Sequence, residues 1–173
     1  MRVVRCMKNL YIDFDGVILD TINVSYELLI KEGINKKDQI ATQKFYSEMD
    51  WKWLLQVTPI INDGINCIQR IIDSGRYNVS ILTHINSLNE AIEKVKYIRK
   101  HFNDITVIPV PKAISKTKMV HTKDAILIDD YDKNLSEWIE EGGIGVLFST
   151  ELEDKGYPVI DCLDKILDFF TEV

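Results

Sequence analysis

Two aspartates, Asp13 and Asp15, stand at the end of a short apolar run and are separated by one residue, with Gly16 directly behind them. The run at residues 10–12 predicts a buried strand. Past the last paired residue of a strand the chain can curl, so both carboxylates can converge on one point. Two carboxylates at one point are costly unless a cation or a proton lies between them. The pattern therefore suggests a metal or proton-transfer site, although a polar strand end entering a turn at Gly16 would have the same sequence.

Polar side chains end two further apolar runs of the chain. Thr83 follows the run at residues 78–82, and Asp129 with Asp130 follows a run of Ala-Ile-Leu-Ile. In open parallel α/β sheets ligands bind outside the carboxyl ends of the strands, so these side chains should gather with the first two aspartates at one sheet edge. Lys116, at the start of a predicted short helix, is expected to join them. Carboxylates, a hydroxyl and an ammonium together suit a hard cation and a phosphoryl group.

Each of these residues also has an ordinary structural explanation. A lone threonine commonly ends a strand, and an Asp-Asp pair commonly forms a turn and caps a helix. The lysine has neighbours of the same type at Lys112, Lys118 and Lys123, of which Lys118 is the main alternative to Lys116. The functional interpretation therefore rests on the ordered set and not on any single residue.

The elements that must position these residues alternate between strands and helices. Apolar runs predict strands at residues 10–12, 78–82, 105–108, 125–128 and 145–148. Helical spacing predicts helices at residues 21–32, 62–74, 88–99, 133–141 and 161–170, with a short one from Ser115. Continuous apolar strands that alternate with helices are typical of a parallel sheet covered on both faces. The predicted fold class is α/β, a Rossmann-like parallel sheet with helices on both faces and a small helical cap inserted after the first strand.

Two of these elements carry more specific expectations. Pro109 and Pro111 are expected to end the strand that begins at Ile105. The helix at residues 88–99 is expected to present an apolar stripe to the core, made of Leu88, Ala91, Ile92 and Val95.

The connection after the first strand is too long for a simple crossover. It runs from residue 13 to residue 78, whereas a crossover needs only about a dozen residues. The helix at 62–74 can serve as the crossover, which leaves the preceding residues as an insertion. We therefore expect a core domain made of residues 1–19 and 61–173, and a helical cap made of residues 20–60.

Composition bounds the possible functions of the chain. Its 173 residues, 46% hydrophobic and 28% charged, fit one compact domain with a small insertion. The net charge of −6 argues against a protein that coats a nucleic acid polymer. Three scattered cysteines without a Cys-x-x-Cys motif indicate reduced thiols in a cytoplasmic protein. A broken apolar run behind the first basic residues is a poor signal peptide, and no stretch is apolar enough to span a membrane. The oligomeric state stays open.

The order of the motifs resembles that of the haloacid dehalogenase (HAD) superfamily of phosphatases: Asp-x-Asp-Gly, a strand-end Thr, a Lys and a strand-end Asp-Asp. This resemblance covers nearly the whole chain. The segment Ile-Leu-Ile-Asp-Asp-Tyr-Asp-Lys-Asn-Leu-Ser-Glu-Trp at 126–138, followed by Gly142 and Gly143, more narrowly resembles the 5′(3′)-deoxyribonucleotidase family. Leu-Thr-His-Ile stands here where the animal enzymes of that family are expected to have Thr-Ser-Pro.

The resemblance implies catalytic and metal-binding roles for four aspartates. Asp13 is the nucleophile that forms an aspartyl-phosphate, while Asp15 protonates the leaving oxygen and then activates water. The implied cofactor is Mg²⁺, held by Asp13, by the backbone carbonyl of Asp15, and by Asp129 with Asp130 in or beside the shell. Which of these last two binds the metal directly stays open.

The resemblance also implies which residues contact the substrate. Thr83 hydrogen-bonds the phosphoryl oxygens, and Lys116 neutralises charge on the nucleophile and the phosphoryl group. His84 is expected beside this centre, as a neighbour of the substrate and not as a metal ligand. Trp51 and Trp53 belong to a set of aromatic residues in the insertion that can stack on a base or pack the cap: Tyr26, Phe45, Tyr46, Trp51 and Trp53.

The leading prediction is therefore a Mg²⁺-dependent phosphomonoesterase that hydrolyses (deoxy)nucleoside monophosphates. One alternative is a phosphatase for another small phosphate ester, such as a sugar phosphate. Another is a non-enzymatic, phospho-accepting signalling domain of the receiver type. In receivers the acid pair ends the first strand and the phosphorylated aspartate ends a central strand. Here the Asp-Asp pair follows both the threonine and the lysine, an order that disfavours the receiver.

Overall fold

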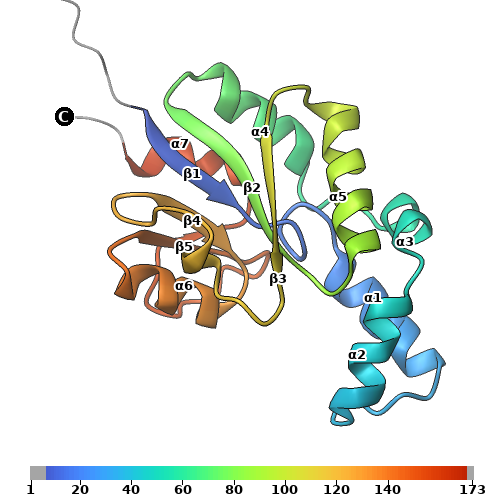
Figure 1. The fold of residues 1–173 in the computed structure, drawn as a ribbon. Coiled ribbons are helices and arrows are strands. Elements are labelled where there is room, and N and C mark those ends of the chain that lie inside the picture. Colours follow the sequence, from blue (N-terminus) through green and yellow to red (C-terminus); the bar gives the residue numbers. More distant parts are fainter. Residues whose placement is uncertain (1–6, 171–173) are drawn as a thin grey trace, which may run out of the picture.

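Residues 7–170 are described by the computed structural model and form a parallel sheet surrounded by helices (Figure 1). The strands are β1 (Lys8–Ile12), β2 (Tyr77–Ile85), β3 (Thr106–Pro111), β4 (Ile126–Asp129), β5 (Ile144–Phe148) and β6 (Val159–Ile160). They lie in the order β3-β2-β1-β4-β5-β6, and every neighbouring pair is parallel. The α/β class and the parallel Rossmann-like sheet predicted from the sequence are confirmed.

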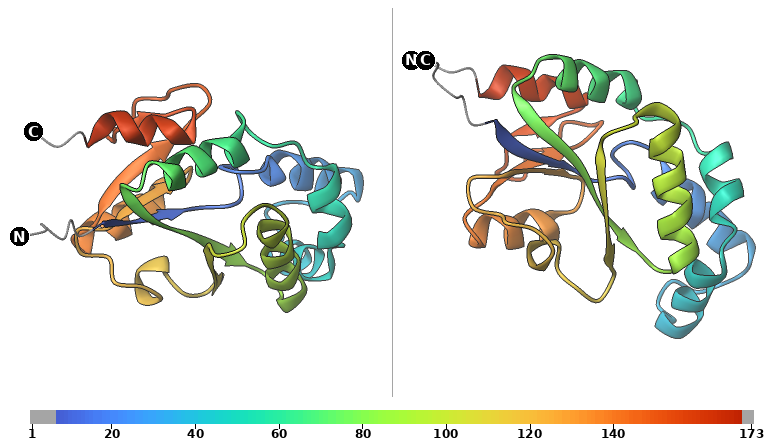
Figure 2. Two further views of the ribbon diagram at one scale, coloured as in Figure 1. Left: turned by 90° about the horizontal axis from the view of Figure 1, so that it is seen from above. Right: turned by 45° about the horizontal axis from the view of Figure 1, so that its top comes forward.

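Helices cover both faces of the sheet because its central strands are apolar on both sides. The helices that follow the first strands are α4 (Gly64–Asp73) and α5 (Leu88–His101), and the later ones are α6 (Asp132–Glu140) and α7 (Ile166–Phe169). On one face α4 and α7 lie side by side (Figure 2), where Ile68 and Ile166 pack into the same core cluster as Leu10. On the other face Trp138 of α6 packs with Leu127.

Strands β1 and β4 are neighbours although the chain forms β2 and β3 between them. The strand order therefore reverses direction between β1 and β4, and such a switch point opens a crevice outside the carboxyl ends of the two strands. The pairing extends one residue past β1, because the Asp13 amide donates to the Ile128 carbonyl at 2.9 Å. Residues that follow β1 and residues that end β4 are thus brought together.

Three helices form the segment at residues 20–60: α1 (Thr21–Lys31), α2 (Gln39–Glu48) and α3 (Trp51–Val57). They lie beyond the ends toward which β1 and β2 point (Figure 1). The two ends of the segment are held together, since Leu19 pairs with Ile60 and the Asp20 amide donates to the Pro59 carbonyl at 3.1 Å. Helix α3 packs against α5. The division of the chain into a core and a cap stays a prediction.

Strand β3 does not end at Pro109, as expected, but includes both Pro109 and Pro111. Within residues 7–170 it is an edge strand that pairs only with β2, so a proline nitrogen directed away from β2 costs the sheet no hydrogen bond. Because β3 continues through Pro111, its partner β2 also runs past Thr83 to Ile85. Its pairing with β1 stops at Ile81, whereas its pairing with β3 continues.

Short elements account for the other differences from the predicted fold. The helix expected from Ser115 is a single 3₁₀ turn, η1 (Lys116–Lys118), in which the Ser115 hydroxyl accepts from the Thr117 amide. The last helix is divided into a 3₁₀ turn, η2 (Leu163–Lys165), and α7. Strand β6 has only two residues and gave no signal in the sequence. Among the helices of residues 7–170, none has the length and apolar character needed to cross a membrane.

Candidate active site

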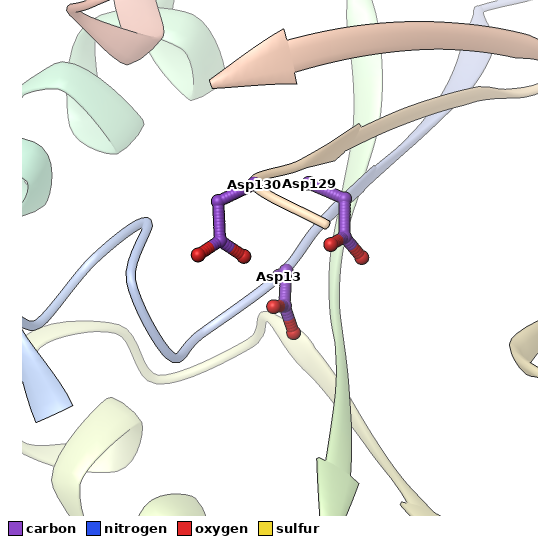
Figure 3. A group of neighbouring side chains, drawn as sticks. All are labelled: Asp13, Asp129 and Asp130. Carbon is purple, nitrogen blue, oxygen red and sulfur yellow. The ribbon is translucent and has the colours of Figure 1, made fainter. Parts of the chain in front are cut away.

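Three aspartates meet at the switch point of the sheet. Asp13 follows β1, and Asp129 and Asp130 come from the end of β4 and the residue after it. One carboxylate oxygen from each lies within 4.8 Å of the others (Figure 3). Asp130 also lies against Gly16, where a Cβ would stand 2.3 Å from Asp130 Oδ2, and Gly16 has a φ of +71°. Glycine at position 16 thus supplies both the turn and the space for this carboxylate.

Lys116 is paired with two of these carboxylates. Its Nζ lies 2.7 Å from Asp13 Oδ1 and 2.7 Å from Asp129 Oδ2, and its side chain is buried. Asp129 Oδ2 also accepts from Asn134 Nδ2 at 3.0 Å, while its Oδ1 accepts from the Tyr131 amide at 2.9 Å. Both oxygens of Asp129 are therefore engaged by protein donors, which fits a residue that orients Lys116. The rival Lys118 is exposed and pairs with Glu141.

The electrostatics of this cluster favour a bound cation. Burial raises the pKa of Asp13 to about 7, even though Lys116 lowers it. Burial, together with the charges of Asp13 and Asp129, raises the pKa of Asp130 to about 8. Three crowded carboxylates and one ammonium leave excess negative charge, which protons or a divalent cation can neutralise.

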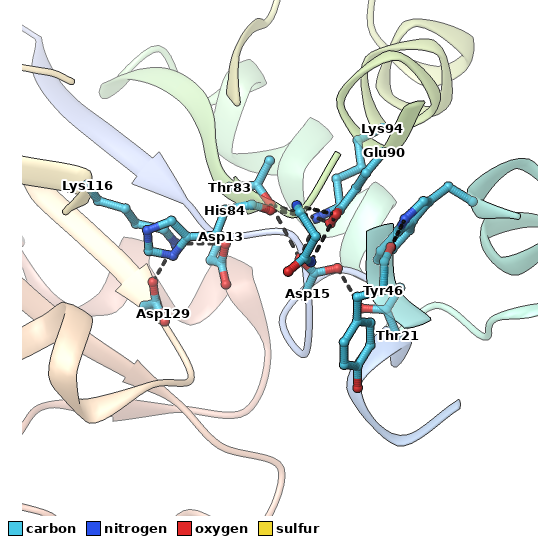
Figure 4. Close-up of polar contacts among 12 residues, drawn as sticks. Asp13, Asp15, Thr21, Tyr46, Thr83, His84, Glu90, Lys94, Lys116 and Asp129 are labelled. Atoms are coloured by element: carbon cyan, nitrogen blue, oxygen red, sulfur yellow. Dashed lines mark hydrogen bonds and ion pairs between the residues drawn. The ribbon is translucent and has the colours of Figure 1, made fainter. Parts of the chain in front are cut away.

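Asp15 points into a second polar cluster, on the side of α5 and α1 (Figure 4). Its Oδ1 accepts from the Thr21 hydroxyl at 2.7 Å, and its Oδ2 accepts from Lys94 Nζ at 2.5 Å. The Thr83 hydroxyl lies 3.4 Å from the same Oδ2 and 3.1 Å from Lys94 Nζ. Thr83 is fully buried, and these contacts join it to Asp15.

Lys94 and Glu90 are two buried charged residues of the site that sequence reasoning missed. Both are buried on α5, and Lys94 Nζ lies 2.6 Å from Glu90 Oε1. The expected apolar stripe of this helix was partly wrong, because Leu88 is 74% exposed and Ile92 is 43% exposed. The helix turns a charged pair toward the site, and each charge can be buried because the other lies beside it. An i,i+4 Glu-Lys pair was the available signal, but such pairs are common on solvent-exposed helix faces.

His84 is a neighbour of the aspartates. Its Nε2 lies 3.0 Å from the Ile114 carbonyl, which can only accept, so Nε2 carries the hydrogen. Burial lowers the pKa of His84, which favours the neutral ring. These contacts fit a residue that fixes the loop before η1 and lines the site.

Among the cavities beside the aspartates, two share Asp15 and His84 in their walls. The smaller, of about 610 Å³, also contains Asp13 and Asp130. The larger, of about 900 Å³, extends toward the helices of residues 20–60. Trp51 lines this larger cavity, together with Tyr46 of α2. Trp53 is 44% exposed and lines neither cavity.

No family model matches the chain, and no curated protein matches it either. Solved structures do match over nearly its whole length. A HAD-superfamily hydrolase of subfamily IA from Geobacter sulfurreducens is 12% identical with a TM-score of 0.62, covering 95% of this chain and 100% of that one. A HAD phosphatase from Thermococcus onnurineus is 18% identical with a TM-score of 0.57, covering 94% and 97%. A protein described as a dehalogenase is 11% identical with a TM-score of 0.61, covering 99% and 100%.

The chain has the fold of the HAD-superfamily hydrolases. In this HAD fold the acidic cluster lies at the carboxyl ends of β1 and β4. The fold expected from the motif order is confirmed. The narrower resemblance to 5′(3′)-deoxyribonucleotidases is not shown by these structures.

Proposed function

We propose that this protein is a Mg²⁺-dependent phosphomonoesterase that acts through an aspartyl-phosphate at Asp13. The observation that carries the proposal is the pairing of Asp13 with Lys116 inside a cluster of three aspartates at the switch point. The buried carboxylate can attack phosphorus, and the ammonium beside it offsets the negative charge of the phosphoryl group. The other acids of the cluster can hold a cation. The HAD phosphatase and hydrolase folds among the neighbours support the same class.

The reaction has two steps at phosphorus. In the first, a carboxylate oxygen of Asp13 forms a bond to phosphorus while the ester P–O bond breaks, and Asp15 gives its proton to the leaving oxygen to release an alcohol. In the second, water attacks phosphorus and gives a proton to Asp15, while the bond between phosphorus and Asp13 breaks. Inorganic phosphate leaves, and both aspartates return to their starting states.

The residues present fit a hard divalent cation. Carboxylate oxygens of Asp13, Asp129 and Asp130 lie close together, and two of these acids have raised pKa values. Asp130 is the stronger candidate for a direct ligand, because both oxygens of Asp129 already accept from protein donors. The ion supplies positive charge beside the phosphoryl oxygens when it is bound. Lys116 supplies a fixed positive charge at Asp13 Oδ1.

Thr83 is proposed to help hold the phosphoryl centre together with Asp15. As a phosphate ligand it stays a prediction, since its observed contacts are with Asp15, Lys94 and the His84 carbonyl. A hydroxyl can donate only one hydrogen bond at a time, so binding a phosphoryl oxygen would require it to release these acceptors.

The proposed substrates are (deoxy)nucleoside monophosphates. Asp15 lines the larger cavity, which also offers the rings of Tyr46 and Trp51. Gln39 and Gln43 lie one helical turn apart on α2 and line the same cavity, and amides of this kind can bind the polar edge of a base. A sugar phosphate is the alternative, in which these polar groups bind hydroxyls.

A panel of phosphomonoesters assayed for released phosphate, with and without Mg²⁺, tests this function. We expect repeated turnover that is lost with chelator and in Asp13→Asn. A single phosphorylation without turnover would favour the receiver type. Release of halide from haloacids, with no action on phosphate esters, would instead favour the chemistry named for the dehalogenase neighbour.

A further inference from the structure

Lys94 is a buried lysine that the proposed reaction does not yet use. Its side chain is fully buried, and its Nζ lies within hydrogen-bonding distance of four oxygens (Figure 4). These oxygens are Asp15 Oδ2 at 2.5 Å, Glu90 Oε1 at 2.6 Å, the His84 carbonyl at 3.0 Å and Thr83 Oγ1 at 3.1 Å. A lysine ammonium has only three hydrogens to donate. Its donors are therefore fully committed to the surroundings of Asp15.

Glu90 holds Lys94 from the other side. Its Oε2 accepts from the Asn86 amide at 2.6 Å and from Asn86 Nδ2 at 3.0 Å, which leaves Oε1 for Lys94. Burial lowers the pKa of Lys94, but the charges of Asp15 and Glu90 raise it to a net value above the ordinary one. The lysine is thus a charged, fixed donor and not a neutral amine.

The same ammonium is enclosed by aromatic rings. Lys94 Nζ lies 5.2 Å from the centre of the Trp51 ring and 5.3 Å from that of Phe14. Trp51 belongs to α3, and its Nε1 donates to the Tyr46 carbonyl at 3.2 Å. Thr21, at the start of α1, fixes the other oxygen of Asp15. Lys94 therefore occupies the place where Asp15 meets the helices of residues 20–60.

We propose that Lys94, fixed by Glu90, is a positioning residue that aims the carboxylate of Asp15 for proton transfer. The proposal rests on the function proposed above, in which Asp15 is the acid of the first step and the base of the second. With Thr21 on one oxygen and Lys94 on the other, the side chain of Asp15 has one orientation. Among residues 7–170, Lys94 is the one charged side chain that pairs with Asp15, through the oxygen that faces α5.

Two aryl esters separate this role from a merely structural one. p-Nitrophenolate leaves without a proton, whereas phenolate leaves poorly unless it is protonated. We would measure kcat and KM for p-nitrophenyl phosphate and phenyl phosphate in wild type, Lys94→Met and Asp15→Asn. A matched control is Lys96→Met on the same helix, because Lys96 is 61% exposed and pairs with Glu93 away from the site.

For Lys94→Met we expect kcat/KM on phenyl phosphate to fall by about 10²-fold or more, the usual scale of general acid catalysis. On p-nitrophenyl phosphate, kcat/KM should stay within about threefold while kcat falls, because only the second step still needs Asp15. A burst of p-nitrophenol should then precede steady turnover. Adding Lys94→Met to Asp15→Asn should cause no further loss of kcat/KM on either ester.

Equal loss of kcat/KM on both esters, or full activity in folded Lys94→Met, would overturn the positioning role. The wild-type protein tests the proposed function separately. If wild type hydrolyses neither ester, the proposed phosphomonoesterase function is wrong, whatever the variants do. Lys94→Met leaves two carboxylates facing each other, so we would also make Lys94→Met with Glu90→Gln, which removes one charge of each sign. The ratio between the two esters in that variant decides the question if the single variant does not fold.

Discussion

The site contains two buried lysines, and each bridges two carboxylates. Lys116 joins Asp13 to Asp129 at the switch point, and Lys94 joins Asp15 to Glu90 at the edge of the helical segment 20–60. The clusters differ in what else surrounds them. Beside Lys116 lies a third carboxylate, Asp130, whereas the rings of Phe14 and Trp51 enclose Lys94.

This difference suggests a division of labour. The Lys116 cluster has three acids for one ammonium and so favours a cation and attack on phosphorus. The Lys94 cluster has two acids for one ammonium, and hydroxyl and amide donors satisfy its remaining oxygens. Its groups are arranged to fix one carboxylate, Asp15, in one orientation.

Replacing the nucleophile should have the largest effect. Asp13→Asn is expected to reduce kcat by about 10⁴-fold or more, the scale on which enzymes lose activity when a covalent nucleophile is removed. The amide has nearly the same shape and removes a buried charge, so the fold should persist, which thermal melting would check. A folded Asp13→Asn variant that keeps more than a trace of wild-type kcat would show that Asp13 in the Lys116 cluster is not the nucleophile.

The two lysines of η1 provide the next test. Lys116→Ala should lower kcat by about 10²- to 10³-fold, because a preorganised charge at the phosphoryl centre is lost. Lys118→Ala, its control, removes an exposed ion pair with Glu141 and should leave kcat near wild type. If Lys118→Ala loses more kcat than Lys116→Ala, the assignment of the catalytic lysine is wrong.

Binding of Mg²⁺ should depend on pH through the Lys116 cluster. The pKa values of Asp13 and Asp130, about 7 and about 8, lie above the ordinary carboxyl value of 3.8. Protons therefore compete with the metal below these values, and Mg²⁺ affinity should rise at least about tenfold between about pH 6 and about pH 8.5. Titration calorimetry at both pH values measures this, with Ca²⁺ as a poorer activator in parallel assays.

The metal-free protein should show the opposite trend in stability. A carboxyl group whose pKa is raised on folding stabilises the protein fully at pH below its unfolded pKa, and this stability is lost as pH rises through the folded pKa. Without Mg²⁺ the free energy of unfolding should thus fall as pH approaches 7 and then 8. Asp130→Asn should weaken both the pH dependence of Mg²⁺ affinity and the pH dependence of the free energy of unfolding. Equal Mg²⁺ affinity at the two pH values would contradict the metal site.

The smallest effect concerns the wall of the larger cavity. Tyr46→Ala should lower kcat/KM for a nucleoside monophosphate by about tenfold, since stacking on a base is worth ~1–3 kcal/mol. It should leave glycerol phosphate unchanged. Trp53→Ala is the control, because Trp53 lines neither cavity. An equal loss of kcat/KM on both substrates would indicate that the segment at 20–60 acts only as a structural lid. It would also remove the reason to prefer nucleotides as substrates.

The sequence predicted the Lys116 cluster better than the Lys94 cluster for a physical reason. Asp13, Asp129 and Asp130 directly follow or end apolar strands, and parallel strands bring their carboxyl ends to one edge whatever their loops do. Lys116 could be chosen over Lys118 from its place behind an N-capping serine, and the structure places Lys116, and not Lys118, beside Asp13.

No such rule marked Lys94. Whether a Glu-Lys pair on a helix faces solvent or a buried acid depends on how the helix packs, and α5 packs against α3 of the helical segment 20–60. The two ends of that segment are joined by a contact between residues remote in sequence, Leu19 and Ile60. The two-residue strand β6 and the proline-containing edge strand β3 also form through pairing with neighbouring strands, which local sequence patterns could not predict.

The central claim is that the Lys116 cluster performs phosphoryl transfer and the Lys94 cluster performs proton transfer. Acid quenching of Lys94→Met during turnover of p-nitrophenyl phosphate with Mg²⁺, followed by mass spectrometry of its peptides, tests both parts together. We predict that a phosphoryl group accumulates on Asp13, because the first step continues while Asp15 no longer activates water efficiently. Wild type should hold less of this adduct. A phosphoryl group on another residue, or turnover with no covalent adduct in either protein, would contradict the account.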